Sequence, residues 1–288
     1  MDLSFRTRYW DDLPAKQAFK DFILHIHGLD FTSWDAAGYW DDDYIPFTYF
    51  AGGQVVASMC IYTMPAIVNG EPCKVAQVSG VGTLPEYRRM GLNRKLHEIA
   101  LDWALGEHKF AFLFADEEAI PFYAKCGFRP IKDYAPLAVL PAAAPKEGLR
   151  KIDLRDAAET RALYGLASHR APVSHVFSNM NPKLVMFHAL YSLREHAYRI
   201  DDLDAVIFMK RDGNRTIVYD LLARELPAFE QLHPYLATGT AQEFEFRFHA
   251  DRLGIVPAGF KELQGNDTHV MGEPDLGAHF VFPFTAHA

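Results

Sequence analysis

The chain has 288 residues, of which 49% are hydrophobic and 23% charged, with 22 Phe and 13 Tyr. This balance excludes a disordered chain, and the length favours two domains. The formal net charge of −8 argues against a non-specific grip on nucleic acid. The three cysteines are too few and too scattered for a disulfide framework, and no apolar stretch resembles a signal peptide or membrane span. We therefore expect a cytoplasmic, soluble protein with no nucleic-acid or membrane partner.

Hydrophobic periodicity and glycine or proline breaks divide the N-terminal half into alternating helices and strands. In chain order the expected elements are a helix over 14–27, a hairpin over 47–63, a strand over 75–83, a helix over 92–106, a strand over 110–115 and a helix over 117–125.

The segment from Leu140 to Gly148 is rich in proline and alanine and poor in bulky residues, so we place a domain boundary there. The predicted domains are 1–143 and 149–288. The elements expected in the second are a helix after Asp156, a helix over 182–199, a hairpin over 204–222, a helix over 227–236, a half-buried strand over 244–248 and core or edge strands over 279–284. Their order coarsely echoes the first half, without a sequence repeat.

The segment Val78–Leu96, V-S-G-V-G-T-L-P-E-Y-R-R-M-G-L-N-R-K-L, predicts a strand, a basic glycine-bearing loop and the start of a helix. A helix start leaves its first N–H groups without intrahelical partners and carries the positive end of the helix dipole, so it can hold an anion. Arg88, Arg89 and Arg94 add guanidinium charge around the same point. The segment therefore predicts a phosphate-binding site.

Within this segment, Arg88-Arg89-Met90-Gly91-Leu92-Asn93 resembles the Q/R-x-x-G-x-G/A signature of the GCN5-related N-acetyltransferases, the GNAT family. The preceding V-G-T-L-P resembles the end of that family's central strand. The last position departs from the pattern, because the family prefers Gly or Ala where this chain has Asn93. A short polar residue is tolerable there because it can help to cap a helix start.

A second match lies downstream, where residues 119–128, A-I-P-F-Y-A-K-C-G-F, resemble the family's A-x-x-F/L-Y-x-x-x-G-F segment. The resemblance implies that Tyr123 is the catalytic tyrosine that protonates the departing CoA thiolate. It makes Asp116 the counterpart of an asparagine that commonly touches the pantetheine arm, although an ionised Asp cannot donate a hydrogen bond. The match looks closest to the Eis-like branch, in which a second, degenerate acetyltransferase domain follows the first.

The resemblance implies an α/β (α+β) fold: a GNAT-like mixed, mostly antiparallel sheet flanked by helices, followed by a second, degenerate GNAT-like α/β domain. It also implies acetyl-CoA as cosubstrate and direct transfer of the acetyl group to a primary amine in a ternary complex. Backbone groups of the central strand would then pair with pantetheine like an added strand. The implied cofactor-binding residues are Val81, Gly82, Thr83, Arg88, Arg89, Met90, Gly91, Leu92, Asn93, Arg94 and Asp116.

An alkylamine has a pKa near roughly 10.4, so a general base must take its proton before attack. None of the candidates has a distinguishing spacing. They are Glu71, Glu117, Glu118, His27, the acidic run Asp41, Asp42 and Asp43, and the carboxylate at Ala288, because the chain end reaches the active site in the Eis-like branch. The histidines show no metal-ligand spacing, and we expect no metal.

The alternative to an enzyme is a non-catalytic acyl-CoA or metabolite sensor, suggested by Asn93 and Asp116. A weaker alternative is a scaffold whose second domain binds protein. For an enzyme, the acceptor is a small-molecule or peptide amine; aminoglycosides, polyamines, peptide amines and small amino compounds all stay open, as does homo-oligomerisation. The second half lacks the Arg-x-x-Gly-x-Gly pattern, so we expect it not to bind CoA.

Overall fold

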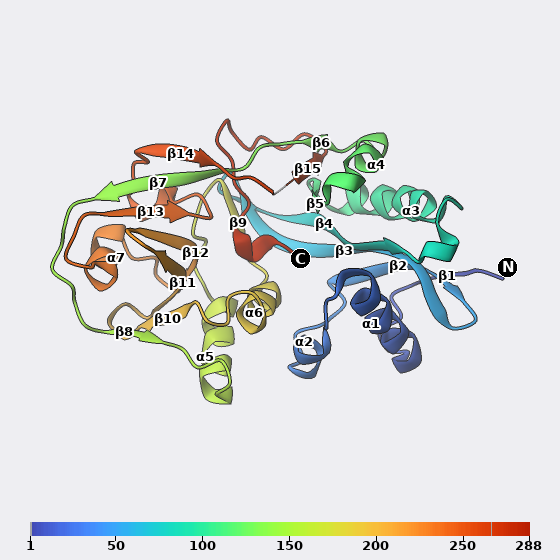
Figure 1. The fold of residues 1–288 in the computed structure, drawn as a ribbon, viewed down its shortest axis with the longest axis horizontal. Helices are drawn as coiled ribbons and strands as arrows, with labels where there is room; N and C mark the ends of the chain where they lie inside the picture. The colour runs from blue at the N-terminus through green and yellow to red at the C-terminus, as the bar shows by residue number, and fades with distance from the viewer. Residues whose placement is uncertain (1, 266) are drawn as a thin grey trace.

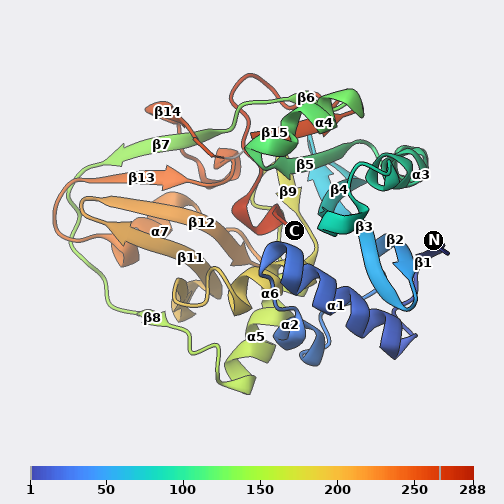
Figure 2. The ribbon, with the colours of Figure 1, turned by 45° about the vertical axis from the view of Figure 1, so that its right-hand side comes forward.

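The computed structural model describes residues 2–265 and 267–288. Two sheets lie side by side, each flanked by helices, and the C-terminal end lies between them (Figures 1 and 2). Both sheets are mixed and mostly antiparallel, which confirms the predicted fold class. In the described part of the chain, no helix combines the length and apolar character needed to cross a membrane.

Within the described residues, the first sheet, sheet A, contains eight strands. Along the sheet they are β1 (Ser4–Thr7), β2 (Tyr44–Ala51), β3 (Gln54–Val68), β4 (Glu71–Thr83), β5 (Ala111–Ala115), β15 (Asp267–Met271) and β6 (Arg129–Pro130), while β9 (Phe177–Asn179) pairs with β3 off this path. The neighbours β4 and β5 are parallel, and the other pairs are antiparallel.

Four α-helices belong to the same half of the chain: α1 (Leu13–His27), α2 (Thr32–Ala36), α3 (Leu92–Glu107) and α4 (Ile120–Lys125). The predicted helices, hairpin and strands of this half are all present within a few residues. Helix α1 begins at the Asp12 side chain, which accepts from the Ala15 N–H, and ends at Gly28 in the left-handed conformation. These caps explain why its limits could be read from the sequence.

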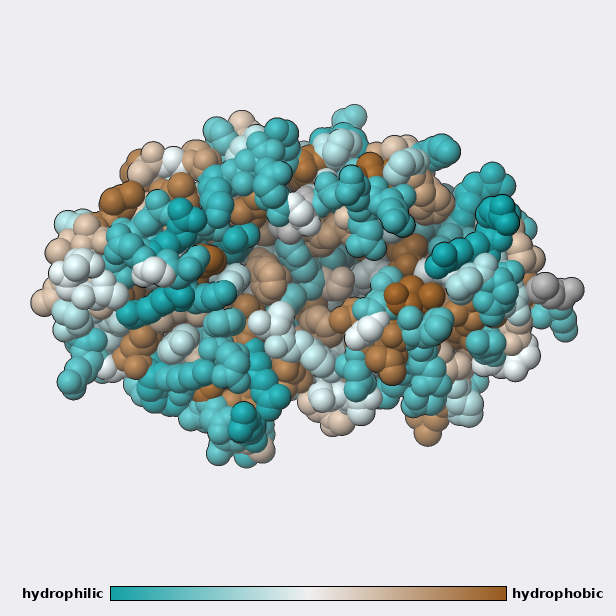
Figure 3. Space-filling model, in the orientation of Figure 1, coloured by the Kyte–Doolittle hydropathy of each residue, from teal (hydrophilic) through white to brown (hydrophobic). Residues whose placement is uncertain are grey.

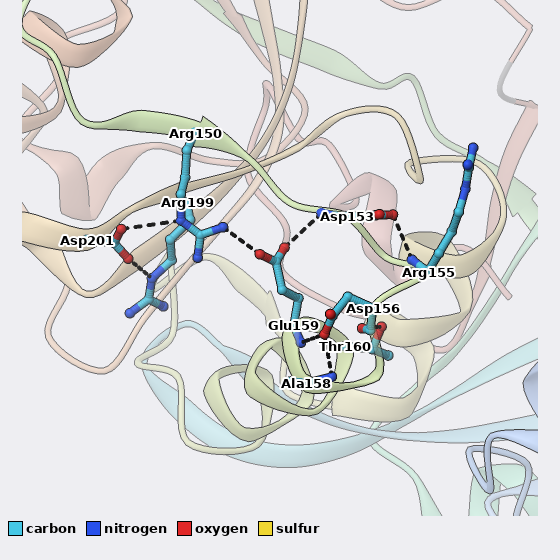
Figure 4. A network of polar contacts seen from close by, with 9 residues as sticks. All are labelled: Arg150, Asp153, Arg155, Asp156, Ala158, Glu159, Thr160, Arg199 and Asp201. Carbon is cyan, nitrogen blue, oxygen red and sulfur yellow. Dashed lines mark hydrogen bonds and ion pairs between the residues drawn. The ribbon is translucent and has the colours of Figure 1, made fainter.

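The second sheet, sheet B, contains seven strands in the part of the chain that the structure describes. In spatial order they are β14 (Gly259–Glu262), β7 (Tyr134–Leu140), β13 (Gln242–Phe246), β12 (Arg215–Ala223), β11 (Ala205–Asp212), β10 (Ala197–Ile200) and β8 (Leu149–Lys151). Its helices are α5 (Ala157–Ser168), α6 (Pro182–Leu190) and α7 (Phe229–Leu236). Arg150 of β8 bridges Glu159 of α5 at 2.8 Å and Asp201, after β10, at 3.3 Å (Figure 4).

The two sheets share one strand pattern. In sheet A, β2, β3 and β4 are antiparallel, β4 is parallel to β5, and β5 is antiparallel to β15. In sheet B, β10, β11 and β12 are antiparallel, β12 is parallel to β13, and β13 is antiparallel to β7. The coarse echo predicted between the halves is therefore present in the topology.

The halves also exchange strands. Strand β7 precedes the predicted boundary but lies in sheet B, and β15, near the C-terminal end, lies between β5 and β6 in sheet A (Figure 1). The proline- and alanine-rich segment joins β7 to β8, so both of its ends lie in sheet B. The predicted linker therefore does not separate the two sheets. That residues 1–143 and 149–288 form two domains stays a prediction.

The helix predicted over 182–199 ends much earlier, so that prediction was wrong at its C-terminal end. Helix α6 stops at Leu190, because Tyr191 adopts φ −115° and ψ −88°, outside the helical region. Residues 197–200 then form β10, whose backbone pairs with β11 on one side and β8 on the other. Two-sided pairing satisfies the backbone polar groups of a buried segment, and here it overrides helical spacing.

The two phenylalanine-rich segments also differ from expectation. Strand β13 is present, but it is not half-buried, because the side chain of Glu245 is fully buried as well. Its carboxylate forms ion pairs with Arg247, at 2.7 Å, and with Lys261, at 2.9 Å. Residues 279–284 contribute buried Phe280 and Phe282 to the core but form no strand. There the Val281 N–H donates to Nε2 of His249, and Pro283 has no N–H to donate.

Candidate functional site

A bulge interrupts β4 where the candidate site begins. Ser58 of β3 faces Gly82, whereas Cys60 faces Ser79, so β4 contains one extra residue between these pairs. Gly80 has φ +58°, and a Cβ atom there would lie 2.8 Å from the Tyr44 hydroxyl oxygen. Both features require glycine. The bulge therefore redirects the backbone at Gly80 and Val81, at the centre of the sheet.

Strands β4 and β5 stay paired over a short length. Their parallel register joins Ala76 to Ala111 and Gln77 to Phe112, and it ends there. Among the described strands, none pairs with residues 78–83 of β4 on the β5 side. The backbone of Val81, Gly82 and Thr83 therefore borders a gap between diverging strands, where an extended ligand could add hydrogen bonds as a further strand does.

The loop after β4 has the geometry of an anion site. A 3₁₀ turn, Pro85–Tyr87, is followed by Arg89 at φ +64° and by Gly91 at φ +75°, the N-cap of α3. Left-handed residues next to a helix start turn successive N–H groups toward one point, which adds to the field of the helix dipole. The segment in which the sequence predicts a phosphate site therefore forms a loop that precedes a 16-residue helix.

The three arginines of the loop and of the first turn of α3 differ in their partners. The Nε of Arg88 donates to the Thr83 carbonyl at 3.3 Å, and Arg94 lies 3.7 Å from Glu98 on the next turn of α3. Arg89 is exposed, as is Met90. Guanidinium groups at the surface of this loop raise the local positive potential of a chain whose net charge is negative.

Asn93 does not cap α3, because it is the second residue of the helix and Gly91 occupies the N-cap. Its Oδ1 is buried without a hydrogen-bond partner in the described structure. Its carbonyl accepts from Nδ1 of His97 at 2.8 Å. Burial lowers the pKa of His97 to about 4, so this ring is neutral near pH 7. The Asn93 side chain therefore makes no capping hydrogen bond at the start of α3.

Tyr123 lies on α4, where its ring is buried beside His97 and Phe122, at centroid distances of 5.7 and 5.5 Å. Burial raises the pKa of Tyr123 well above its usual value, and the nearby carboxylate of Asp116 raises it further. The phenol is therefore protonated near neutral pH and can donate a proton. Asp116 itself is exposed at the end of β5.

A pocket of about 340 Å³ joins these residues to both halves of the chain. In Figure 3, hydrophobic side chains border the hollowed centre of the visible face and gather over α1. The pocket is lined by Ile23, His27, Leu29, Phe31, Trp34, Tyr44, Tyr62, Gln77, Val78, Ser79, Gly80, Val81, Phe114, Asp116, Tyr123, Leu184, Phe187, His287 and Ala288.

Of the candidate general bases, His27 and Ala288 line this pocket, whereas the others do not. Partial burial lowers the pKa of His27, while Asp116 and the Val81 backbone oppose that shift. Asp41 forms an ion pair with Lys183, and its Oδ1 accepts from the Asp43 N–H at 3.0 Å. Within the acidic run, the carboxylate of Asp41 is thus engaged in other contacts outside the pocket.

The C-terminal segment is held at the pocket by both halves. Gln77 of β4 accepts the Ala288 N–H at 2.9 Å, and the ring of His287 stacks on Phe114 of β5 at 3.7 Å. The Nε2 of His188, on α6, donates to the His287 carbonyl at 2.6 Å. Burial lowers the pKa of His188 to about 4, so this hydrogen bond is made by a neutral ring.

The structure thus brings Val81, Asp116 and Tyr123 to one pocket and places Gly82, Thr83 and residues 88–94 along the same end of β4. Sequence reasoning missed the aromatic side chains that line the pocket from the α2 segment, β2, β3 and α6, among them Trp34, Tyr44, Tyr62 and Phe187. No local spacing marks those residues, because they meet across the two halves. In the described chain, no group of His, Cys, Asp or Glu could hold a metal ion.

Comparison with known families agrees with this geometry. Residues 6–128 match the model of the "Acetyltransferase (GNAT) family". The matched stretch includes the bulged strand, the basic loop and Tyr123. The match therefore assigns residues 6–128, and not the rest of the chain, to a GNAT acetyltransferase domain, and it supports a transferase activity. None of the curated proteins matches the chain.

Solved structures extend the likeness of fold to both sheets. Eis1 from Mycobacterium abscessus is 16% identical, with a TM-score of 0.55, and the match covers 94% of this chain and 73% of that one. A conserved protein of unknown function from Enterococcus faecalis V583 has a TM-score of 0.62 at 12% identity, covering 94% and 72%. A GCN5-related N-acetyltransferase from Anabaena variabilis has a TM-score of 0.55 at 12% identity, covering 93% and 72%.

Proposed function

We propose that this protein is an acetyl-CoA-dependent N-acetyltransferase that acetylates a primary amine by direct attack in a ternary complex. The observation that carries the proposal is the meeting of Val81, Asp116 and Tyr123 at one pocket, next to the loop that opens α3. The gap between β4 and β5 fits an extended pantetheine arm, and the loop N–H groups fit a pyrophosphate.

In this proposal the amine nitrogen attacks the thioester carbonyl, the carbon–sulfur bond breaks, and the CoA thiolate takes a proton from Tyr123. A backbone N–H at the β4 bulge stabilises the oxyanion, since preorganised donors suit developing charge. We assign proton uptake from the amine to His27, because it lines the pocket and its lowered pKa keeps the imidazole neutral.

The cosubstrate assignment is tested by calorimetric titration with acetyl-CoA. Replacing Arg89 by Glu puts a negative charge at the proposed phosphate loop, so we expect affinity to fall by about 100-fold. The matched control is Arg161→Glu, an exposed charge reversal on α5, which should leave affinity unchanged. Unchanged affinity in Arg89→Glu would overturn the assignment.

Tyr123→Phe separates binding from chemistry, because it removes the hydroxyl and keeps the ring. We expect acetyl-CoA affinity to be retained and kcat to fall by about 10²-fold or more, the usual contribution of a positioned acid. The readout is release of free CoA thiol with an amine that the wild type acetylates. A variant with wild-type kcat would refute the role given to Tyr123.

A further inference from the structure

The pocket has two chemically different parts. One part contains His27, Val81, Asp116 and Tyr123, the groups given roles in transfer. The other part is a wall of hydrophobic side chains. They belong to α1, α2 and the residues between these helices, to β2 and β3, and to α6. We call it the aromatic wall; its members are Ile23, Leu29, Phe31, Trp34, Tyr44, Tyr62, Leu184 and Phe187.

The rings of the aromatic wall contact one another and form a continuous surface. Trp34 lies 5.7 Å from Phe31, 5.6 Å from Phe187 and 6.4 Å from Tyr62, measured between ring centroids. Tyr44 lies 5.6 Å from Tyr62. Edge-to-face contacts of this kind fix the rings, so the wall presents a preformed apolar surface to a ligand.

Few charged side chains line the pocket beside the wall. Asp116 is the one carboxylate side chain among the described residues that line the pocket. Burial raises the pKa of Tyr62, and the nearby Asp41 and Asp43 raise it further. However, Asp41 is paired with Lys183, and neither carboxylate lines the pocket. A polycation that entered would lose its hydration and find few carboxylates in exchange.

We infer that the acceptor is a primary amine carried on an aromatic or similarly apolar body, which packs on the aromatic wall and directs its nitrogen toward His27 and Tyr123. This inference rests on the proposed function. An apolar surrounding also disfavours the ammonium form and so lowers the pKa of the bound amine. The same wall that selects the body thereby helps a weak base such as His27 to generate the nucleophile.

The first test compares 2-phenylethylamine with ethylamine, which differ by the ring alone. Burying a phenyl ring on the wall should raise kcat/KM by about 30-fold. Spermidine and an aminoglycoside serve as cationic acceptors for comparison. Their kcat/KM should be lower than that of 2-phenylethylamine. Acetylation that favours either cationic acceptor would overturn the inference and leave the proposed function intact.

A second comparison tests whether the wall binds the body of the acceptor or the acyl chain of the cosubstrate. With ethylamine as acceptor, hexanoyl-CoA is compared with acetyl-CoA, and we expect no gain from the longer chain. If hexanoyl-CoA were preferred and the phenyl ring gave no advantage, the wall would hold an acyl chain and the inference would be wrong. If acetyl-CoA bound but no amine were acetylated, the proposed function would fail and the inference with it.

Matched variants place the effect on the pocket. Leu29, just after the end of α1, lines the pocket and is 46% exposed, whereas Leu24, in the last turns of α1, is 52% exposed and does not line it. Leu29→Asp should lower kcat/KM for 2-phenylethylamine several-fold and raise it for spermidine. Leu24→Asp should change neither, and equal effects of the two variants would refute the assigned site. Phe187→Ala should reduce the advantage of 2-phenylethylamine over ethylamine by about tenfold.

Discussion

At the scale of single residues, His27 is the group whose assigned role has the clearest consequence for pH dependence. Neutral imidazole is the active form of a base, and protonation removes it. Because partial burial lowers the pKa of His27, the acid limb of kcat should have its midpoint below the ordinary histidine value near 6.5.

Replacing His27 by Gln should remove that limb and lower kcat by about 10²-fold. His25→Gln is the matched control, because His25 is an exposed histidine on the same helix and does not line the pocket. The measurement is kcat against pH for the wild type and both variants. Persistence of the limb in His27→Gln would assign it to another group.

Residue types at fixed spacing could be interpreted from the sequence, and residue environments could not. The motif around Gly91 and the segment around Tyr123 predicted a strand, loop and helix, and the structure has them. The position of Asn93 inside the first turn of α3, rather than at its cap, depends on Gly91 adopting φ +75°. The aromatic wall is assembled from segments that lie far apart in the sequence, so no local sequence pattern could predict it.

At the scale of elements, β12 anchors the 3₁₀ turn Phe284–Ala286 that leads to the pocket. Asp220 of β12 is 2.8 Å from Arg170, with both side chains almost fully buried, and it accepts the Thr285 hydroxyl at 2.5 Å. Asn179 of β9 donates to the Thr285 carbonyl at 2.6 Å. A buried ion pair in the second half thus fixes a segment that lines the first half's pocket.

Asp220→Asn should lower the free energy of unfolding by about 3–5 kcal/mol, because it leaves the buried Arg170 without its counter-charge. Thr285→Ala removes the hydroxyl alone and should cost about 1 kcal/mol. Urea unfolding measures both, with the exposed Asp212→Asn, at the β11–β12 turn, as a control within about 0.5 kcal/mol. An Asp220→Asn variant as stable as its control would contradict this account of the anchor.

Element limits could be predicted where a cap or turn marks them, as at Asp12, Gly28 and the Gly52–Gly53 turn. The predicted limits were wrong where pairing with strands far away in the sequence determines the secondary structure. Residues 197–200 read as the end of a helix, yet they complete sheet B between β8 and β11. The burial of Glu245 likewise depends on three cations that local spacing does not reveal together: Arg215 of β12, Arg247 after β13 and Lys261 of β14.

At the scale of the whole molecule, the exchange of β7 and β15 predicts that the halves fold together. Phe112 of β5 stacks on Phe282 at 4.2 Å and lies 6.4 Å from Phe177, and both partners come from the second half. A fragment of residues 1–143 would leave Phe112 and one edge of β5 uncovered, and exposed apolar edges favour aggregation.

We therefore expect the 1–143 fragment to be insoluble or self-associated in size-exclusion chromatography, whereas the full chain unfolds in one cooperative transition. A monomeric fragment with its own cooperative unfolding would support the independent domains predicted from the proline- and alanine-rich segment. The resemblance to the GNAT family implied the fold class. The exchange could not be predicted, because it depends on pairings between strands more than 100 residues apart.

The most direct test of the central claim is to incubate the wild-type protein with acetyl-CoA and 2-phenylethylamine, and to measure free CoA thiol together with the mass of the amine. The account predicts one acetylated amine for each thiol released, and loss of both signals in Arg89→Glu. Tight acetyl-CoA binding with neither product, over the phenylethylamine, spermidine and aminoglycoside acceptors, would contradict it and favour an acyl-CoA sensor.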